Sequence, residues 1–324
     1  MQKICVNMEY LILILSLAGI VLGADFLVKG AVVVARKCRV SSFVIGAVIV
    51  GIGTSLPELV VSTVGAIGGN SEVAIGNVVG SNIFNVFAIL GLTALFFPIA
   101  VSRENMKFEI PFCIAVSVLL MLLVYNFFIV GEPRLGRWDG AALLLVFTSF
   151  MWISLRRGTS SAATVGESVE EVNKSLWFAA FSILGGLAAL IVSSNFFVDE
   201  AVAIARKLGV SDAFISITLL ACGTSLPELA ASVTAAVKKD TDMALGNIIG
   251  SNIFNATMIL GTASLITPLT TGKIGLVDYG AMILAAVLPM IFGIRGKITR
   301  FEGLLMLLCY ATYTWYIVTY VMAV

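Results

Sequence analysis

The same seven letters, GTSLPEL, occur twice in this sequence, at residues 53–59 and 223–229. An offset of 170 residues, which carries residue 53 onto residue 223, aligns the two halves without a gap from about Asp25 to Pro98. A second identity at this offset is GSNIFN, at residues 80–85 and 250–255. Identity this dense at one offset indicates an internal duplication, so the two halves must adopt related folds.

The composition places both halves in a membrane. Of the 324 residues, 59% are hydrophobic and only 12% are charged, and the mean hydropathy is +1.05. A soluble domain carries about 25% charged residues, and several uncharged apolar runs exceed the ~20 residues that cross a bilayer as a helix. We therefore expect an all-α polytopic membrane protein, integral to the cell (plasma) membrane and in contact with the lipid bilayer.

Net charge and residue usage argue against several other classes. The formal net charge of +1 gives no indication of a nucleic-acid partner. Histidine is absent, which removes the commonest transition-metal ligand and the usual proton carrier at neutral pH. The five cysteines form no CxxC pair, so neither a disulfide framework nor a zinc site is indicated. We expect no cofactor.

Hydropathy predicts ten transmembrane helices, five in each half. They are expected near residues 10–35, 41–67, 73–98, 108–129, 138–156, 176–205, 211–237, 243–268, 276–294 and 302–322. This pattern predicts a first five-helix repeat over residues 1–156, a polar cytoplasmic linker over 157–175 and a second repeat over 176–324. Because five is odd, the two repeats must enter the membrane from opposite sides.

The distribution of basic residues predicts which side faces the cytoplasm. With the N-terminus outside, the inner side holds Arg36, Lys37, Arg39, Arg103, Lys107, Arg156, Arg157, Lys174, Lys238, Lys239, Arg295, Lys297 and Arg300. The outer side then holds only Lys3, Arg134, Arg137, Arg206, Lys207 and Lys273. Cytoplasmic loops are enriched in lysine and arginine, so we expect both termini outside. Inverted repeats of this kind are typical of secondary transporters, whose binding site lies at the repeat interface near the midplane.

The repeated motif places a proline and a glutamate inside an apolar stretch. Between Arg39 and Glu72 the only charged residue is Glu58. Pro57 has no N–H, so the carbonyl of Gly53, four residues earlier, loses its donor. Freed carbonyls are tolerated at membrane depth only beside a cavity or inside protein, and a carboxylate there is by default functional. The motif therefore predicts a polar site inside the membrane.

Neighbouring polar residues extend this predicted site. Residues at helical spacing lie near one face of a helix, and in the two copies of the motif these are Thr54, Ser55, Glu58 and Ser62, and Thr224, Ser225, Glu228 and Ser232. The following spans add polar stripes, Asn77, Ser81 and Asn85 in one copy and Asn247, Ser251 and Asn255 in the other. Small-xxx-small pairs on these spans, which allow close helix approach, are Gly76 with Gly80 and Gly246 with Gly250.

The resulting set of groups consists of two carboxylates surrounded by amide, hydroxyl and carbonyl oxygens. An all-oxygen site without histidine or thiolate suits a hard cation. Calcium takes about 6–8 oxygens in flexible geometry, and two glutamates would neutralise its charge. Sodium is also a hard cation and could use the same oxygens.

These motifs resemble those of the cation/calcium antiporter superfamily, and within it the sodium/calcium exchanger branch. The resemblance rests on two alpha-repeats, GTSLPE followed by GNxxGSNIFN, at residues 53–85 and 223–255, and it covers essentially the whole chain. It implies a secondary active antiporter that exchanges calcium for sodium by alternating access. It also implies that the spans 10–35 and 176–205 slide over the other helices as the moving gate. The GNAxE-type motif of the superfamily's cation/proton exchangers is absent.

The resemblance further implies roles for individual residues. Glu58 and Glu228 would be the central shared ligands of calcium and sodium. Backbone carbonyls would come from Thr54 and Thr224, and further oxygens from Ser55, Ser225, Ser81, Ser251, Asn85 and Asn255.

One position departs from the family pattern. Many sodium/calcium and potassium-dependent exchangers carry an aspartate where this chain has Asn255. The site then has two carboxylates and not three, which weakens any expectation of potassium dependence and leaves the sodium stoichiometry open. Two glutamates could also take two protons and cross the membrane uncharged. A calcium/proton antiporter on the same fold is therefore the alternative.

Two further classes fit the sequence less well. An intramembrane hydrolase using Ser55 or Ser225 would need a neighbouring base, but histidine is absent and Lys29 is nearer the end of its span. We therefore expect no enzymatic activity. A channel is compatible with the sequence, but inverted repeats with broken helices favour alternating access over a continuous pore. Lys29 also follows Asp25 by four residues, a spacing typical of an ion pair.

Overall fold

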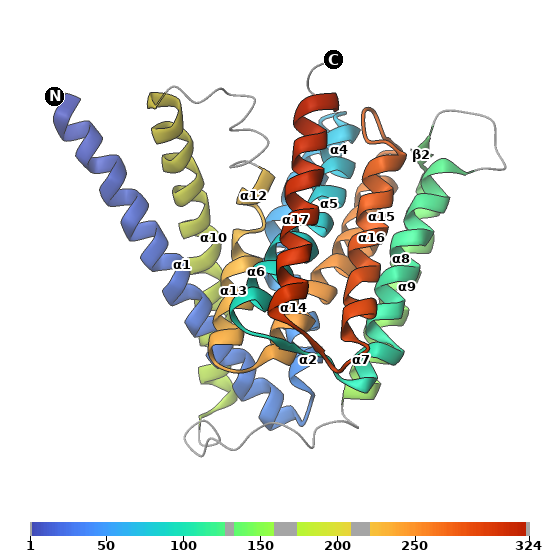
Figure 1. The fold of residues 1–324 in the computed structure, drawn as a ribbon, viewed down its shortest axis with the longest axis horizontal. Helices are drawn as coiled ribbons and strands as arrows, with labels where there is room; N and C mark the ends of the chain where they lie inside the picture. The colour runs from blue at the N-terminus through green and yellow to red at the C-terminus, as the bar shows by residue number, and fades with distance from the viewer. Residues whose placement is uncertain (1, 127–132, 159–173, 209–220, 322–324) are drawn as a thin grey trace.

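The structure is a computed structural model that describes residues 2–126, 133–158, 174–208 and 221–321 (Figure 1). In the first half the elements, with η denoting a π-helical segment, are α1 (Gln2–Cys38), α2 (Ser42–Ile45), η1 (Gly46–Val50), α3 (Gly51–Thr54), α4 (Leu56–Ile67), α5 (Ser71–Phe84), η2 (Asn85–Leu90), α6 (Gly91–Phe96), β1 (Ile99–Ala100), α7 (Arg103–Lys107), α8 (Glu109–Tyr125), β2 (Arg134–Leu135) and α9 (Arg137–Gly158).

The second half repeats this order in the part of the chain that is described. Its elements are α10 (Leu176–Lys207), α12 (Ala221–Gly223), α13 (Leu226–Val237), α14 (Thr241–Phe254), η5 (Asn255–Ile259), α15 (Leu260–Ile266), β3 (Leu269–Thr270), α16 (Leu276–Gly293), β4 (Lys297–Ile298), α17 (Arg300–Tyr316) and η6 (Ile317–Val321). The bounds of α4 and α13, and of α5 and α14, coincide at the offset seen in the sequence. The duplication therefore extends to the structure.

The fold is an all-helical polytopic membrane fold. Within the described residues, eight helices are long and apolar enough to cross a membrane, and the bent pair Ser42–Thr54 and Leu56–Ile67 makes a ninth candidate span. The expected span 211–237 begins outside the described residues, and only its end is seen, as α12 and α13. Most of the expected linker 157–175 also lies outside them. The remaining spans fall close to their predicted positions.

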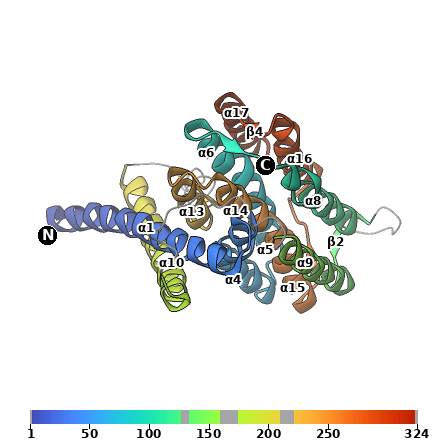
Figure 2. The same ribbon diagram turned by 90° about the horizontal axis from the view of Figure 1, so that it is seen from below.

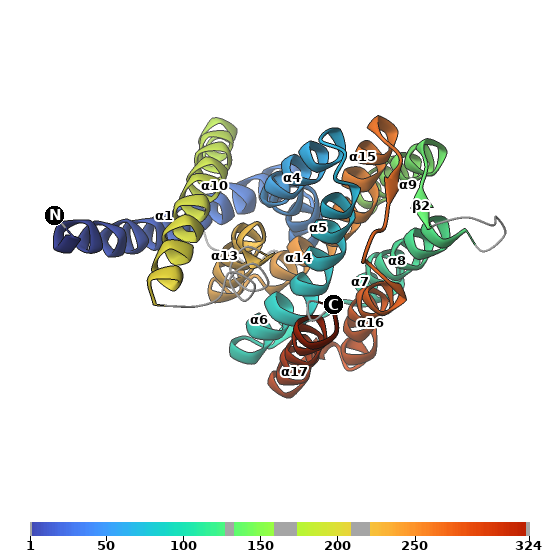
Figure 3. The ribbon, with the colours of Figure 1, turned by 90° about the horizontal axis from the view of Figure 1, so that it is seen from above.

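Two equivalent helices form the centre of the bundle. In the spans that begin with α5 and α14, 78% and 83% of the most apolar 18-residue stretch is buried inside the protein. In the other spans made of a single helix this share is 39% or less. Figures 2 and 3 show α5 and α14 between α4 and α13 on one side and α8, α9, α16 and α17 on the other. The polar stripes predicted on these two spans are therefore placed inside protein and not against lipid.

The two halves run in opposite directions. Figure 1 shows α1 descending from the N-terminus at the top and α10 rising toward the top. The ion pair between Glu9, near the start of α1, and Lys207, at the end of α10, agrees with this antiparallel arrangement. The two helices approach closely where Gly23 faces Gly186, because a Cβ on either glycine would lie within 3 Å of the other's carbonyl oxygen. Together they form a pair at one side of the bundle (Figure 3).

Short strand pairs join the two halves at both ends of the bundle. β1 pairs with β4, with Ile99 opposite Ile298, and β2 pairs with β3, with Leu135 opposite Leu269. β1 and β3 are equivalent by the offset, but they lie at opposite ends, because α7 directly after β1 is at the bottom of Figure 1 and β2 is at the top. The repeats are therefore inverted. A strand pair connects them at each end of the bundle.

Close helix approach is confirmed for the second copy of the small-xxx-small pair. Within the described residues it is wrong for the first, because a Cβ added to Gly80 would have nothing within 4 Å. A Cβ added to Gly246 would lie 2.1 Å from the carbonyl oxygen of Phe43, and one added to Gly250 would lie 2.4 Å from the Cα of Ala47. Side chains at these positions would overlap the backbone of the first repeat. The two glycines thus bring α14 against α2 and η1, next to the GTSLPEL motif.

Candidate cation-binding site

Each GTSLPEL motif forms a break between two helices. In the first copy α3 ends at Thr54, α4 begins at Leu56, and the two segments are bent by 47°. Pro57 lies in the first turn of α4, where a missing N–H leaves no helical bond unmade. The second copy has the same arrangement, with Pro227 in the first turn of α13. The proline thus starts a new helix, and does not merely kink a continuous one.

The break places a glutamate at the start of each new helix. Glu58 lies in the first turn of α4 and Glu228 in the first turn of α13, and both side chains are fully buried. The N-terminus of a helix carries a partial positive charge that stabilises a nearby anion. Two buried carboxylates are therefore held at the positive ends of two half-helices, in equivalent positions of the inverted repeats.

The two carboxylates are held by serines from opposite repeats. Ser55 Oγ donates to Oε1 of Glu228 at 2.8 Å, and Ser225 Oγ donates to Oε1 of Glu58 at 2.9 Å. A third hydroxyl, Ser81 Oγ, lies 3.5 Å from Glu58 Oε1 and 3.3 Å from Ser225 Oγ. The crossed contacts bring the two copies of the motif together across the repeat interface.

The threonine and the remaining serine of the predicted set lie next to this centre. Thr54 Oγ1 is buried, donates to the carbonyl of Val50 at 3.0 Å and lies 3.3 Å from Asn247 Oδ1. Ser251 Oγ donates to the carbonyl of Gly51 at 3.2 Å. Thr224 is half-buried in the break between α12 and α13. The structure therefore brings the predicted hydroxyl residues of both motifs to the same interface.

Asn77 and Asn247 act on the backbone of the glutamates. Asn247 Nδ2 donates to the carbonyl of Glu228 at 3.1 Å and to Ser232 Oγ at 2.8 Å. Asn77 Nδ2 makes the equivalent contacts, to the carbonyl of Glu58 at 3.3 Å and to Ser62 Oγ at 3.0 Å. Each asparagine therefore fixes the first turn of the half-helix that carries its glutamate.

A reciprocal asparagine pair that the sequence analysis did not single out lies between α5 and α14. Asn82 Nδ2 donates to the carbonyl of Asn252, and Asn252 Nδ2 donates to the carbonyl of Asn82, both at 3.1 Å. Their side-chain oxygens accept from the predicted site residues: Asn85 Nδ2 donates to Asn252 Oδ1 at 3.0 Å and Asn255 Nδ2 to Asn82 Oδ1 at 3.1 Å. The pair orients both predicted amides.

The sequence did hold a signal for this pair. Asn82 and Asn252 occupy the same place in the repeated GSNIFN segment, and a residue on the pseudo-two-fold axis must meet its own copy. Their helices also change form at the last residue of the segment, because π-helical turns begin at Asn85 and at Asn255. Single π-helical turns inside α-helices are frequent at functional sites.

Four buried oxygen acceptors at this interface have no hydrogen-bond partner among the described residues. They are Oε2 of Glu58, Oε2 of Glu228, Oδ1 of Asn85 and Oδ1 of Asn255. Buried polar atoms are normally satisfied, and exceptions call for an explanation. These four are related in pairs by the repeat, and all are acceptors. A cation, a proton or a hydrogen-bond donor such as water satisfies such a set, whereas a further acceptor or an apolar group would not.

The chemistry of the donor set limits which cation fits. Within the described residues, no group of three or more His, Cys, Asp or Glu side chains could hold a metal ion. A cation at this interface must therefore combine the two carboxylates with neutral oxygens, which suits the hard alkali and alkaline-earth ions.

The sequence and the fold are similar to those of known proteins. The family model for the sodium/calcium exchanger protein matches residues 8–156 and 178–319. The sodium/calcium exchanger MaX1 of Methanosarcina acetivorans is 34% identical over 342 residues, covering 95% of this chain and 98% of MaX1. The inner membrane protein YrbG of Escherichia coli is 34% identical over 292 residues, covering 86% of each chain.

Among solved structures, the sodium-calcium exchanger NCX_Mj, soaked with 10 mM Na+ and without Ca2+, has a TM-score of 0.82 and 32% identity to this chain. The match covers 97% of this chain and 99% of NCX_Mj. The motif, the inverted repeat and the matched length all agree: the chain is an integral membrane protein that belongs to the sodium/calcium exchanger family.

Proposed function

We propose that this protein exchanges calcium for sodium across the membrane by alternating access, with Glu58 and Glu228 as the shared ligands of both ions. The observation that carries the proposal is the set of four buried acceptor oxygens without partners, two of them carboxylate oxygens, at the interface of the inverted repeats. Thr54, Thr224, Ser55, Ser225, Ser81, Ser251, Asn85 and Asn255 would complete the oxygen shell.

The charge of the site is compatible with either of two competing sets of ions. Two carboxylates balance one calcium ion or two sodium ions, and both ions prefer oxygen ligands. Each carboxylate already accepts a hydrogen bond from a serine of the other repeat. An ion bound by both carboxylates would therefore contact residues of both repeats and hold the two repeats together. The relatives agree with this cargo: MaX1 is named a sodium/calcium exchanger, and NCX_Mj has been solved after soaks with Na+, Ca2+ and Sr2+.

The proposal includes a topology. Ten spans would form two five-helix repeats over residues 1–156 and 176–324, joined by a cytoplasmic linker at 157–175, with both termini outside the cell membrane. The excess of basic residues on the α7 side of the bundle supports this orientation. α1 and α10 would be the moving gate, and their place as a separate pair at one side of the bundle supports that role.

The test is radioactive calcium uptake into proteoliposomes that contain the purified full chain. Uptake is driven in one arm by an outward sodium gradient and in the other by an outward proton gradient. Uptake with sodium alone is the expected result. Uptake with protons alone would replace the proposal with calcium/proton antiport on the same fold, and uptake in neither arm would mean that the cargo is wrong.

A further inference from the structure

The helix α10 lies against the helix breaks of both GTSLPEL motifs. It packs against α3, which ends at the first break, and against α12 and α13, which flank the second. A Cβ added to Gly53 would lie 2.7 Å from Cδ1 of Leu187, and one added to Gly223 would lie 2.9 Å from Cγ2 of Val198. An aliphatic side chain of α10 therefore covers the first glycine of each motif, and these two contacts identify the face of α10 that is turned toward the motifs.

A third side chain on this face of α10 is polar. Ser194 follows Leu187 by seven residues and precedes Val198 by four, spacings that place all three on one side of a helix. At about 1.5 Å per residue, Ser194 lies about 10 Å along α10 from Leu187 and about 6 Å from Val198. It is therefore placed between the two helix breaks, where the crossed serine contacts also hold the two carboxylates.

The hydroxyl of Ser194 is buried and unsatisfied. The residue is 2% exposed, and its Oγ has no hydrogen-bond partner among the described residues. A buried serine or threonine in a helix can donate to the carbonyl four residues earlier, as Ser117, Thr257 and Ser264 do. Ser194 makes no such bond. A buried polar atom without a partner calls for an explanation, and the lone pairs of this oxygen are free to bind a cation.

Packing between α1 and α10 does not explain the hydroxyl. The offset of 170 carries Leu187 onto Leu17 and Val198 onto Val28 of α1, but it carries Ser194 onto Ala24. Ala24 is fully buried, so an alanine fills the equivalent place in the first repeat. The aliphatic residues are thus common to both helices, whereas the oxygen is present on α10 and not at the equivalent position of α1.

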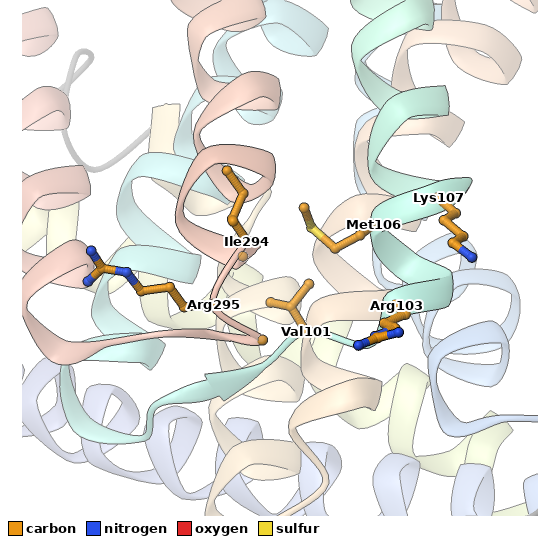
Figure 4. A pocket seen from close by; sticks show the side chains of 8 residues that line it. Val101, Arg103, Met106, Lys107, Ile294 and Arg295 are labelled. Atoms are coloured by element: carbon orange, nitrogen blue, oxygen red, sulfur yellow. The ribbon is translucent and has the colours of Figure 1, made fainter.

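The cavity at the end of the bundle, between α7 and α16, is not a competing cation site. Its volume is about 500 Å³, and none of the side chains that line it carries an oxygen atom. The charged residues of its lining, Arg103, Lys107 and Arg295, are all basic, and Lys107 and Arg295 point away from it on opposite sides (Figure 4). Calcium is therefore expected to bind near the glutamates and not in this cavity.

We propose that Ser194 is a hydroxyl ligand that α10 contributes to the transported cation, in addition to the oxygens of the two motifs and of α5 and α14. This inference rests on the proposed exchange function, in which α10 is part of the moving gate. A ligand on this helix links the occupancy of the site to the position of the gate, because the ion and α10 then contact each other directly.

The test is equilibrium binding of radioactive calcium to the purified full chain, with cadmium as the competitor. A thiolate is a soft ligand that favours soft metal ions. Ser194→Cys should therefore lower the cadmium concentration that displaces half of the calcium by at least about tenfold. Ser194→Ala should raise the calcium Kd by at least about threefold, because it removes one oxygen ligand. The native cysteines are present in every variant, so the comparison with the wild type isolates the new thiol.

The matched control is Ser193→Cys, which places a thiol one residue earlier on α10. Ser193 faces α1, because its Oγ would lie 2.2 Å from a Cβ added to Gly19. This variant should keep the wild-type cadmium competition, and thermal unfolding checks that each variant is folded.

Two results would overturn the role of Ser194. One is wild-type calcium affinity in Ser194→Ala together with wild-type cadmium competition in Ser194→Cys. The other is an equal cadmium shift in Ser193→Cys and Ser194→Cys. Failure of the wild type itself to bind calcium is a different result, which would overturn the proposed exchange function and this inference with it.

Discussion

Ser55 of the first repeat donates its hydroxyl hydrogen to Glu228 of the second at 2.8 Å, and Ser225 returns the equivalent contact to Glu58 at 2.9 Å. Each carboxylate is thus positioned by the repeat to which it does not belong. Separation of the two motifs would remove a donor from both buried carboxylates at once. The site is therefore a joint property of the two repeats, which is what a transporter with a single central site requires.

The crossed serine contacts predict similar effects of Ser55→Ala and Ser225→Ala. Hydrogen bonds to charged groups contribute about 1.5–3 kcal/mol, so each variant should weaken calcium binding by about tenfold or more. The half-saturating calcium concentration of uptake measures this effect. Ser149→Ala is the control, because its exposed hydroxyl donates only to the carbonyl of Leu145. Normal calcium dependence in both motif variants would show that the crossed contacts do not shape the site.

The reciprocal asparagine pair predicts combined losses of stability and binding. Asn82→Leu should remove the donor to the carbonyl of Asn252 and the acceptor for Asn255. Leaving buried polar groups unsatisfied costs about 1–3 kcal/mol. We expect the variant to unfold at lower temperature and to bind calcium more weakly, as judged by thermal unfolding with and without calcium.

The control for this pair is Asn70→Ala, because Asn70 is exposed and its side chain makes no capping hydrogen bond to α5. A lowered melting temperature with wild-type calcium binding in Asn82→Leu would limit the pair to a structural role.

Close packing at the second small-xxx-small pair predicts that Gly250→Ala strongly lowers the stability of the fold. The added Cβ would lie 2.4 Å from the Cα of Ala47, a backbone atom that cannot move without shifting η1. Overpacking of a tight core costs about 1–3 kcal/mol or more. We expect a lower melting temperature and a lower yield of folded protein. Gly280→Ala, exposed in α16 with nothing within 4 Å of the added Cβ, should leave both unchanged, and equal behaviour of the two variants would contradict the packing.

The ion pair between α1 and the end of α13 predicts a small, salt-dependent effect on exchange rate. Lys238 Nζ lies 2.7 Å from Asp25 Oδ1, and Lys29 Nζ lies 2.6 Å from Asp25 Oδ2. If α1 slides during transport, this link must break. The pair is partly exposed, so it is worth at most about 1 kcal/mol, and Lys238→Gln should raise the exchange rate by less than about fivefold.

The acceleration in Lys238→Gln should disappear at high salt, where the wild-type ion pair is screened. Lys239→Gln, which removes the same charge at the adjacent exposed position, is the control. Identical rates for Lys238→Gln and the wild type at low salt would mean that the link persists throughout the cycle.

Much of the architecture could be predicted because a bilayer leaves few solutions. The sequence has apolar runs long enough to span a bilayer and an odd number of predicted spans per repeat, which together predict an inverted arrangement. In agreement with this, α1 and α10 run antiparallel (Figure 1). The ion pair of Asp25 with Lys29 is also confirmed. The number of spans and their sidedness stay predictions, since residues 209–220 lie outside the described part.

The residues of the candidate site could be found from one rule, that charge inside an apolar stretch needs a reason. Glu58 and Glu228, with their flanking serines, were identified in this way and do meet at the repeat interface. The Asn82 and Asn252 pair was missed because a helical stripe counted every four residues from Asn77 passes beside it. The crossed pairing of the serines could not be predicted either, because it depends on how two helix breaks face each other.

The strand pairs show a further limit of sequence reasoning. β1 to β4 are two residues each, too short for an alternating pattern to reveal them. Their pairing depends on the inverted repeat bringing loops from both halves to the same end of the bundle.

The most direct measurement for the central claim is equilibrium binding of calcium to the purified protein, titrated at several sodium concentrations. The wild type should bind calcium saturably, and sodium should raise the apparent Kd competitively. Glu58→Gln and Glu228→Gln should each abolish calcium binding while the protein stays folded, and Glu104→Gln, an exposed carboxylate outside the site, should bind normally. Wild-type calcium affinity in either motif variant would contradict a shared site built on these two glutamates.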